Sequence, residues 1–246
     1  MALARGIGRR GVLAGAAALA GCQQPVAPQV DVTPRLGPNR TGYIAIQGLI
    51  INEVRNAFIG QVNRLLALNA AEIYLLMISP GGVVTAAQDM IAFMDRTHAD
   101  RGTTFTTHNV GVVASAACYV FLAGQRRLSV PRGQFLFHEA ALVSNGAITS
   151  LALQDANIKM QQIEHAFLAM LTARTKLTEA EATSFIRRTV ILNADEARRD
   201  GITQATADFT LPQGATAFGI RAVPAGTAPA GTVPARRPET GGGGSG

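Results

Sequence analysis

The sequence contains no tryptophan, two cysteines (Cys22 and Cys118), two lysines (Lys159 and Lys176) and four histidines in 246 residues. Two cysteines supply neither a disulfide framework nor a cysteine zinc site. None of the histidines has a second His or Cys three or four positions away, and the carboxylates are not grouped at metal-ligand spacing. No Gly-x-x-x-x-Gly-Lys phosphate loop occurs. We therefore expect neither a metal ion nor a cofactor.

The sequence also lacks the charge pattern of a nucleic-acid-binding protein. Its formal charge is +6, but residues 1–21 hold three arginines and no acidic residue, so their removal would leave +3. No run of Arg and Lys is interleaved with aromatic residues. We expect no nucleic-acid partner.

Residues 1–21 have the pattern of an export signal. Three arginines precede an apolar Ala, Leu and Gly run that is too short to span a bilayer, and Leu19-Ala-Gly-Cys22 follows. This ending resembles a lipoprotein signal, in which Cys22 becomes the lipidated first residue, and Arg9-Arg10 resembles a twin-arginine signal. The alternative is an uncleaved N-terminal anchor. We expect an exported protein held to the membrane through lipid, on the periplasmic side of a bacterial envelope.

Composition then divides the chain into four parts. Residues 1–21 are the signal peptide, and 22–40, rich in Pro, Val and Gln, form a tether. Residues 41–210 suffice for one domain with a sizeable core. Residues 211–246 are rich in Pro, Ala, Gly and Thr, which predicts a flexible tail.

Hydrophobic periodicity within residues 41–210 alternates between strand and helix. Apolar strands are expected at 43–47, 73–78, 103–110 and 128–137, and helical spacing occurs at 54–68, 84–96 and 150–174. Two short helices are expected between the capping box of Thr178 to Glu181 and Gly201. Near-continuous apolar strands separated by helices predict an α/β fold, with helices packed on a parallel sheet.

The segment Gly111 to Gly124 places Ser115 among small residues, immediately before an apolar helix. Unpaired backbone N–H groups at a helix N-terminus stabilise developing negative charge, so this is a suitable place for a nucleophile. The alternative is that Ser115 is an ordinary N-cap residue.

Two further segments favour the nucleophile. The predicted strand before Ser79-Pro80-Gly81-Gly82 breaks into a turn whose glycines let backbone N–H groups approach a ligand, and another predicted strand ends at His138. A nucleophile, a base and glycine amides would thus meet at strand ends of one sheet. Glu139 is a poor orienting acid for His138, because neighbouring side chains in a strand point to opposite faces.

These motifs resemble a known family. Ile78-Ser-Pro-Gly-Gly82, Gly111-x-x-Ala-Ser115 and Val130-Pro131 followed by Phe137-His138 are similar to the proteolytic subunit of the Clp protease, with its Clp/crotonase fold, over about Gly42 to Asp208. The resemblance implies a parallel sheet of βαβ units. It also implies that Ser115 is the nucleophile and His138 the general base, and that the N–H groups of Gly81 or Gly82 and of Ala116 form the oxyanion hole.

One position departs from the family pattern. The family's third catalytic residue is an Asp shortly before a Ser-Ala-x-Glu-Ala segment, which here reads Asn193-Ala-Asp-Glu196-Ala197. Counting back places Thr189 where the Asp is expected.

The predicted helix from Ser150 to Arg174 is longer than average, with apolar residues recurring from Leu151 through Ile158, Ile163 and Phe167 to Leu171. In the resembling family this position holds a handle helix that pairs with another subunit, which implies a homo-oligomer. The alternative is an amphipathic helix folded back on its own sheet.

Together these observations predict an exported, lipid-anchored serine peptidase that acts on peptides or unfolded proteins through Ser115 and His138. No ATPase partner is expected, because ATP is scarce outside the cytoplasm. The alternatives are a catalytically weak or inactive scaffold, because of Thr189, and an acyl-CoA enzyme of the crotonase type. A Ser-Lys hydrolase has little support, since neither Lys159 nor Lys176 lies in a matching motif.

Overall fold

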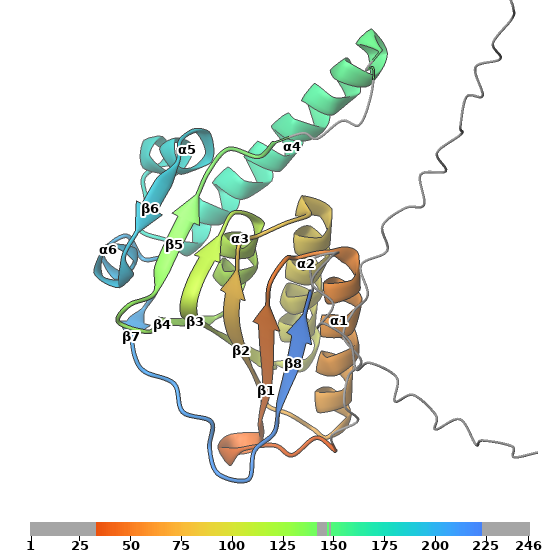
Figure 1. Ribbon diagram of the computed structural model, residues 1–246, viewed down its shortest axis with the longest axis vertical. Coiled ribbons are helices and arrows are strands. Elements are labelled where there is room, and N and C mark those ends of the chain that lie inside the picture. Colours follow the sequence, from red (N-terminus) through yellow and green to blue (C-terminus); the bar gives the residue numbers. More distant parts are fainter. Residues whose placement is uncertain (1–32, 142–146, 148, 223–246) are drawn as a thin grey trace, which may run out of the picture.

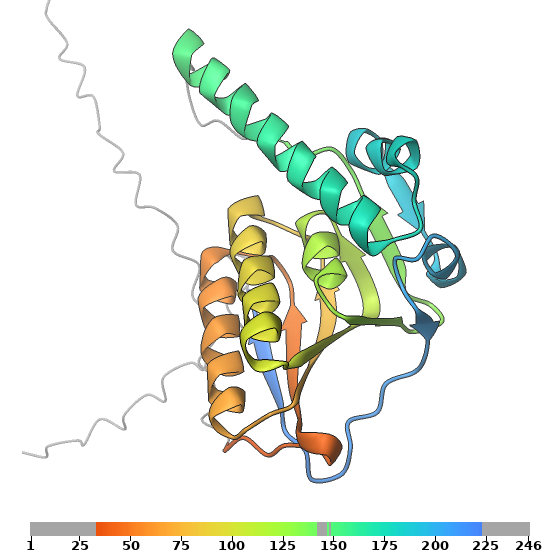
Figure 2. The ribbon, with the colours of Figure 1, turned by 180° about the vertical axis from the view of Figure 1, so that it is seen from behind.

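A computed structural model describes residues 33–141, 147 and 149–222. The predicted signal peptide, Cys22 and residues 223–246 lie outside these described residues. Helices α1, α2 and α3 cover one face of a single sheet (Figures 1 and 2). The strands are β1 (Thr41–Gln47), β2 (Glu72–Ser79), β3 (Thr104–Ala114), β4 (Arg126–Ser129), β5 (Gln134–Phe137), β6 (Val190–Leu192), β7 (Ala205–Thr206) and β8 (Ala217–Arg221). The helices are η1 (Pro38–Arg40), α1 (Asn52–Ala67), α2 (Val84–Arg101), α3 (Ala116–Leu122), α4 (Ser150–Arg174), α5 (Glu179–Arg187) and α6 (Ala194–Arg199).

The sheet has the strand order β6-β5-β3-β2-β1-β8, and β4 pairs with both β3 and β7. Every pairing is parallel except that of β5 with β6. The α/β fold with a mostly parallel sheet, predicted from the alternation of strands and helices, is confirmed.

The core lies between the sheet and its helices. Ile73, Leu75 and Met77 of β2 are fully buried, whereas the residues between them are only partly buried, because successive side chains of a strand point to opposite faces. The apolar stripe of α1, which includes Val54 and Phe58, is fully buried against this face. The alternating apolar residues of β2 and the helically spaced apolar residues of α1 are therefore buried in the same core.

Strand β3 is longer than the sequence predicted, because it continues from residue 110 to Ala114, directly before Ser115. Its first half pairs with β4, between Thr106 and Asn109, and its last residues pair with β5. The small residues after Val110 thus continue the strand. The extension carries Ser115 to the end of the sheet where β5 also ends.

The predicted boundary of the domain at residue 210 is wrong, because Ala217 to Arg221 form strand β8. This strand pairs parallel with β1, and its Phe218 and Ile220 are buried while Gly219 is exposed. The alternation of buried and exposed residues in β8 extends over only five positions. The Gly, Ala and Thr residues around it make this alternation hard to recognise in the sequence. Residues 211–222 therefore belong to the folded domain and not to a tail.

Helix α4 packs on the rest of the chain only through its C-terminal half. Phe167 and Leu171 are buried there, whereas Leu151, Leu153 and Ile158 are 66%, 58% and 53% exposed. Figure 1 shows the N-terminal half of α4 projecting away from the sheet. The alternative of a helix folded back on its own domain therefore holds only for the C-terminal half. Among the described residues, no helix has the length and apolar character needed to cross a membrane.

Candidate active site

Ser115 stands at the turn from β3 into α3 in a strained backbone conformation. Its φ is 55° and its ψ is −132°, a combination that costs about 1–3 kcal/mol for a residue with a side chain and that is concentrated at functional sites. It occupies the N-cap position, yet its side chain accepts no capping hydrogen bond within the described part of the chain. Helix capping, the alternative considered above, therefore does not account for this hydroxyl.

The Pro-Gly-Gly turn after β2 lies directly against Ser115. A Cβ added to Gly81 would lie 2.5 Å from the Cβ of Ser115 and 3.0 Å from the amide nitrogen of Ala116. A Cβ at Gly82 would lie 2.3 Å from the carbonyl oxygen of Ile50. Both glycines also have positive φ, 96° and 147°. These positions require glycine for space and for backbone conformation alike.

The glycine amides differ in their hydrogen bonding. The N–H of Gly81 donates to Ser79 Oγ at 3.2 Å, and Ser79 is 1% exposed. Within the described residues, the N–H groups of Gly82 and Ala116 have no recorded acceptor. The Gly82 and Ala116 N–H groups are therefore the ones free to serve as the predicted oxyanion donors, and that role stays a prediction. The sequence did not lead us to predict that Ser79 accepts a hydrogen bond from the Gly81 N–H. A Ser two residues before a Gly commonly makes such a side-chain-to-backbone turn.

His138 reaches the same end of the sheet from β5. The register pairs Ala114 with Leu136, and the N–H of Ser115 donates to the Leu136 carbonyl at 2.7 Å. The Nδ1 atom of His138 lies 2.6 Å from the carbonyl oxygen of Glu139. Because a carbonyl can only accept, Nδ1 carries the proton, and Nε2 of the neutral ring is an acceptor. This is the tautomer that a general base for a serine hydroxyl needs.

No hydrogen bond between Ser115 Oγ and His138 is present in the described part of the chain. Catalytic hydrogen bonds are often long without substrate and shorten when it binds. The structure therefore brings Ser115, Gly81, Gly82, Ala116 and His138 to one edge of the sheet, and their chemical roles stay a prediction.

Comparison with known proteins agrees with this arrangement. Residues 29–208 match the family described as Clp protease. The ATP-dependent Clp protease proteolytic subunit 4 of Rhodococcus jostii (strain RHA1) is 31% identical over 175 residues, which cover 70% of this chain and 86% of that protein. The chain belongs to the Clp protease family. The family resemblance inferred from the three motifs is thereby confirmed.

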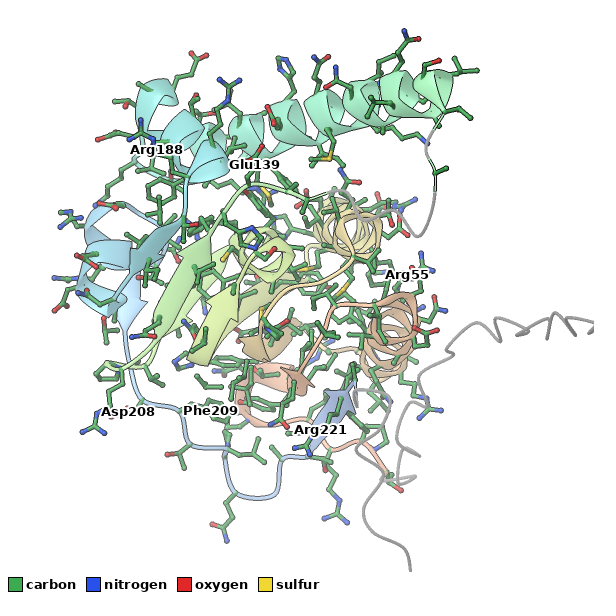
Figure 3. The ribbon with its side chains drawn as sticks, turned by 45° about the horizontal axis from the view of Figure 1, so that its top comes forward. Arg55, Glu139, Arg188, Asp208, Phe209 and Arg221 are labelled. Atoms are coloured by element: carbon green, nitrogen blue, oxygen red, sulfur yellow. The ribbon has the colours of Figure 1, made fainter. Side chains whose placement is uncertain are left out.

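Thr189 directly precedes β6, as His138 directly follows β5. The antiparallel register of β5 with β6 pairs Phe137 with Val190, so continuing it by one residue places His138 opposite Thr189. Thr189 is exposed, and no hydrogen bond links it to His138 among the described residues. The role of Thr189 as the third catalytic residue stays a prediction, and the group bonded to the His138 imidazole is the Glu139 carbonyl. Figure 3 labels Glu139 and Arg188, the residues next to this pair, on the side of α5 and β6.

The other candidate residues lie elsewhere. Cys118 is fully buried, and its thiol contacts the Val113 carbonyl, as expected of a small core residue. His108 is also fully buried, and its ring bonds the Tyr74 hydroxyl and the Ala207 carbonyl. Lys159 is on the projecting part of α4, and Lys176 follows its C-terminus. No group of three or more potential metal ligands occurs in the residues that the structure describes.

Proposed function

We propose that this Clp protease family member is a serine peptidase in which Ser115 is the nucleophile and His138 the general base. The observation that carries the proposal is the strained, uncapped Ser115 packed against the Gly81 backbone. A residue in such a strained backbone conformation persists only where the surrounding structure holds it there. Nucleophiles are commonly held this way.

In this mechanism the Ser115 hydroxyl attacks the carbonyl carbon of a peptide bond while His138 Nε2 takes its proton. The N–H groups of Gly82 and Ala116 stabilise the oxyanion, and the imidazolium then gives the proton to the leaving amine. Water repeats the sequence on the acyl-enzyme and releases the second product. The Glu139 carbonyl accepts a hydrogen bond from Nδ1–H of His138 throughout and holds the orientation of the ring.

The proposed substrates are peptides or already unfolded proteins. The similar Rhodococcus protein is named ATP-dependent, whereas we propose that this chain works without ATP. The support is the resemblance of residues 1–21 to an export signal and of Leu19 to Cys22 to a lipobox, since a protein on the periplasmic side of a bacterial envelope has little access to ATP. The proposed membrane attachment is a lipid on Cys22.

We further propose that the chain forms a homo-oligomer through α4. The projecting half of this helix carries Leu151, Leu153 and Ile158, each more than half exposed. A helix that displays apolar side chains without covering them gains stability when a second subunit buries them.

A catalytically weak or inactive Clp-like scaffold is the second candidate. It is favoured by the exposed, uncharged Thr189 next to His138 and by the absence of a bond between Ser115 and His138 in the described residues. The Clp-type motifs reduce the support for an acyl-CoA enzyme of the crotonase type, which needs no Ser-His pair.

Labelling with a fluorophosphonate separates the two candidates, because only an activated serine reacts. We expect the wild-type chain to be labelled at Ser115 and to hydrolyse peptides without added ATP. Ser115→Ala and His138→Ala should lose both properties, whereas Ser184→Ala, a change in α5, should keep both. A correctly folded wild-type chain that is never labelled would establish the scaffold.

A further inference from the structure

A second concave site lies far from Ser115 along β3. Arg127 of β4 pairs with Thr107, whereas Leu136 of β5 pairs with Ala114. The two pairings are seven positions apart along β3, which corresponds to roughly 23 Å at 3.3 Å per residue. At the Arg127 end is a cavity of about 660 Å³ between β4, the end of α4 and α6.

The cavity is strongly basic. Five of its lining side chains are cationic and one is acidic, and they come from three separate elements and the segments that join them: Arg127, Arg174, Lys176, Arg198, Arg199 and Asp195. Cations in the last turn of a helix interact favourably with its dipole, which explains Arg198 and Arg199 at the end of α6. It does not explain why Arg127 and Lys176 converge on the same space.

Arg127 contributes a buried charge that has no carboxylate partner among the residues that the structure describes. The residue is 8% exposed, and its guanidinium donates to four backbone carbonyls, those of Gly124, Arg174, Gly201 and Ile202. Burial, together with the nearby Arg174, lowers the pKa of this group below its usual value. The carbonyls satisfy its hydrogen bonds, but its positive charge is not neutralised in the wall of the cavity.

The remaining cations are only partly compensated. Arg174 pairs with Asp95 at 2.6 Å and Arg199 with Asp200 at 2.9 Å. Lys176 and Arg198 are exposed and form no ion pair with any described residue. The wall also contains Thr203, which is 2% exposed and whose Oγ1 has no hydrogen-bond partner within the described part of the chain. Such an unsatisfied buried hydroxyl is costly and is relieved by a polar ligand once its side chain rotates toward it.

We propose that this cavity binds a phosphate-bearing anion with at least two negative charges. A single carboxylate would leave most of the excess charge uncompensated, whereas a phosphate matches several Arg and Lys side chains at once. The volume lies in the range of small-molecule sites and exceeds what one inorganic ion fills. Soluble phosphate esters and the headgroups of anionic phospholipids share this chemistry. The site is independent of the proposed hydrolase.

Titration calorimetry with inorganic pyrophosphate on the full chain tests this proposal. We expect saturable binding that weakens as NaCl is added. The double variant Lys176→Gln with Arg198→Gln should bind about tenfold more weakly or worse, since each removes a charge-assisted contact. The double variant Arg64→Gln with Lys159→Gln loses the same charge from exposed positions on α1 and α4 and should bind like the wild type. Equal thermal transitions for both variants exclude misfolding as the cause.

A parallel titration with soluble short-chain phosphatidylglycerol identifies the source of the phosphate. Tighter binding of this lipid than of pyrophosphate, lost in the Lys176 and Arg198 variant, assigns the site to a lipid headgroup. Binding of pyrophosphate alone assigns it to a soluble phosphate compound. The proposal is overturned if neither compound gives saturable binding in the millimolar range, or if the two double variants bind equally.

Discussion

The Cα of Gly81 lies so close to Ser115 that a methyl group at residue 81 would be 2.5 Å from the Ser115 Cβ. We therefore expect Gly81→Ala to displace Ser115 and to abolish fluorophosphonate labelling. Because φ is 96° at this position, the substitution should also lower the free energy of unfolding by about 1–3 kcal/mol. Labelling and chemical denaturation measure the two effects separately.

Gly60→Ala is the matched control for this prediction. Gly60 lies in α1, and a Cβ there would meet no atom within 4 Å. Alanine is the better helix former, so the free energy of unfolding should rise by about 0.5–1 kcal/mol and labelling should not change. If Gly81→Ala is labelled at the wild-type rate, the close contact is unimportant for the reactivity of Ser115.

The buried His108 predicts a dependence of stability on pH. Burial lowers its pKa, although its bond to the Ala207 carbonyl and the charge of Asp208 oppose the shift. The unfolded chain therefore binds a proton at higher pH than the folded chain does. Stability contributed by neutral His108 is complete above the unfolded pKa of about 6.5 and is lost as pH falls from there through the folded pKa.

We expect the thermal transition of the wild type to fall between pH 7 and pH 5 by more than that of His108→Gln. The variant should be less stable at neutral pH, because the Tyr74 hydroxyl and the Ala207 carbonyl lose a partner. Figure 3 labels Asp208 and Phe209 in the segment after β7, and the Phe209 ring lies against the His108 ring with centroids 6.1 Å apart. His165→Gln, at an exposed position of α4, should keep the wild-type dependence. Identical slopes in wild type and His108→Gln would contradict the prediction.

The projecting half of α4 gives a test of assembly. Ile158→Glu should lower the mass measured by light scattering, because it places a charge on an apolar side chain that is 53% exposed. Asn157→Asp adds the same charge at the neighbouring exposed position and should have a smaller effect. Phe167 is unsuitable for this test, since it is buried and its ring stacks on Tyr119 with centroids 3.5 Å apart. A wild-type chain that is monomeric at micromolar concentration would exclude pairing through α4.

The proposed lipid anchor is tested at Cys22. Cys22→Ser removes the acceptor thiol, so the protein should be either unlipidated and soluble or uncleaved at its signal. Fractionation into detergent extracts and the mass of the N-terminal peptide distinguish these outcomes. Cys118→Ser is the control, because that thiol is buried in the core and cannot accept lipid in the folded chain. Unchanged processing and fractionation of Cys22→Ser would exclude lipidation.

Much of the fold could be predicted from the sequence because its signals are local. The stripe of α1 and the apolar run of β2 each bury one continuous face, so periodicity alone identifies them. The capping box of Thr178 and Glu181 likewise depends on neighbours in the chain, and it is present. Strand β8 could not be found this way, because its partner β1 lies far away in the sequence.

The candidate site was likewise predictable where its signals are local and not where they depend on distant parts of the chain. Ser115, His138 and the glycines were identified because short motifs surround them. The contact of Gly81 with Ser115 and the pairing that places His138 opposite Thr189 depend on strand register, which a sequence does not display directly. The basic cavity is lined by side chains from three segments that are distant in the sequence, and no sequence motif identifies it.

Thr189 is the position where a single substitution most directly tests the proposed catalyst. An acid there holds the histidine in the tautomer that accepts the serine proton and stabilises the imidazolium that forms, and losing it from a triad costs about 10⁴ in rate. Here the Glu139 carbonyl, 2.6 Å from Nδ1, selects the same tautomer. It carries no charge, however, so we expect Ser115 to be weakly activated and not inert.

Thr189→Asp should therefore raise the rate of peptide hydrolysis by more than about tenfold, with an upper limit near 10⁴. The register of β5 with β6 places the new carboxylate opposite His138, where it can replace the Glu139 carbonyl as the acceptor of the Nδ1 proton. Thr189→Asn has nearly the same shape without the charge and should leave the rate close to that of the wild type. The gain should disappear when Thr189→Asp is combined with Ser115→Ala. If Thr189→Asp leaves turnover unchanged and Ser115 is never labelled by fluorophosphonate, the chain is a scaffold and not a hydrolase.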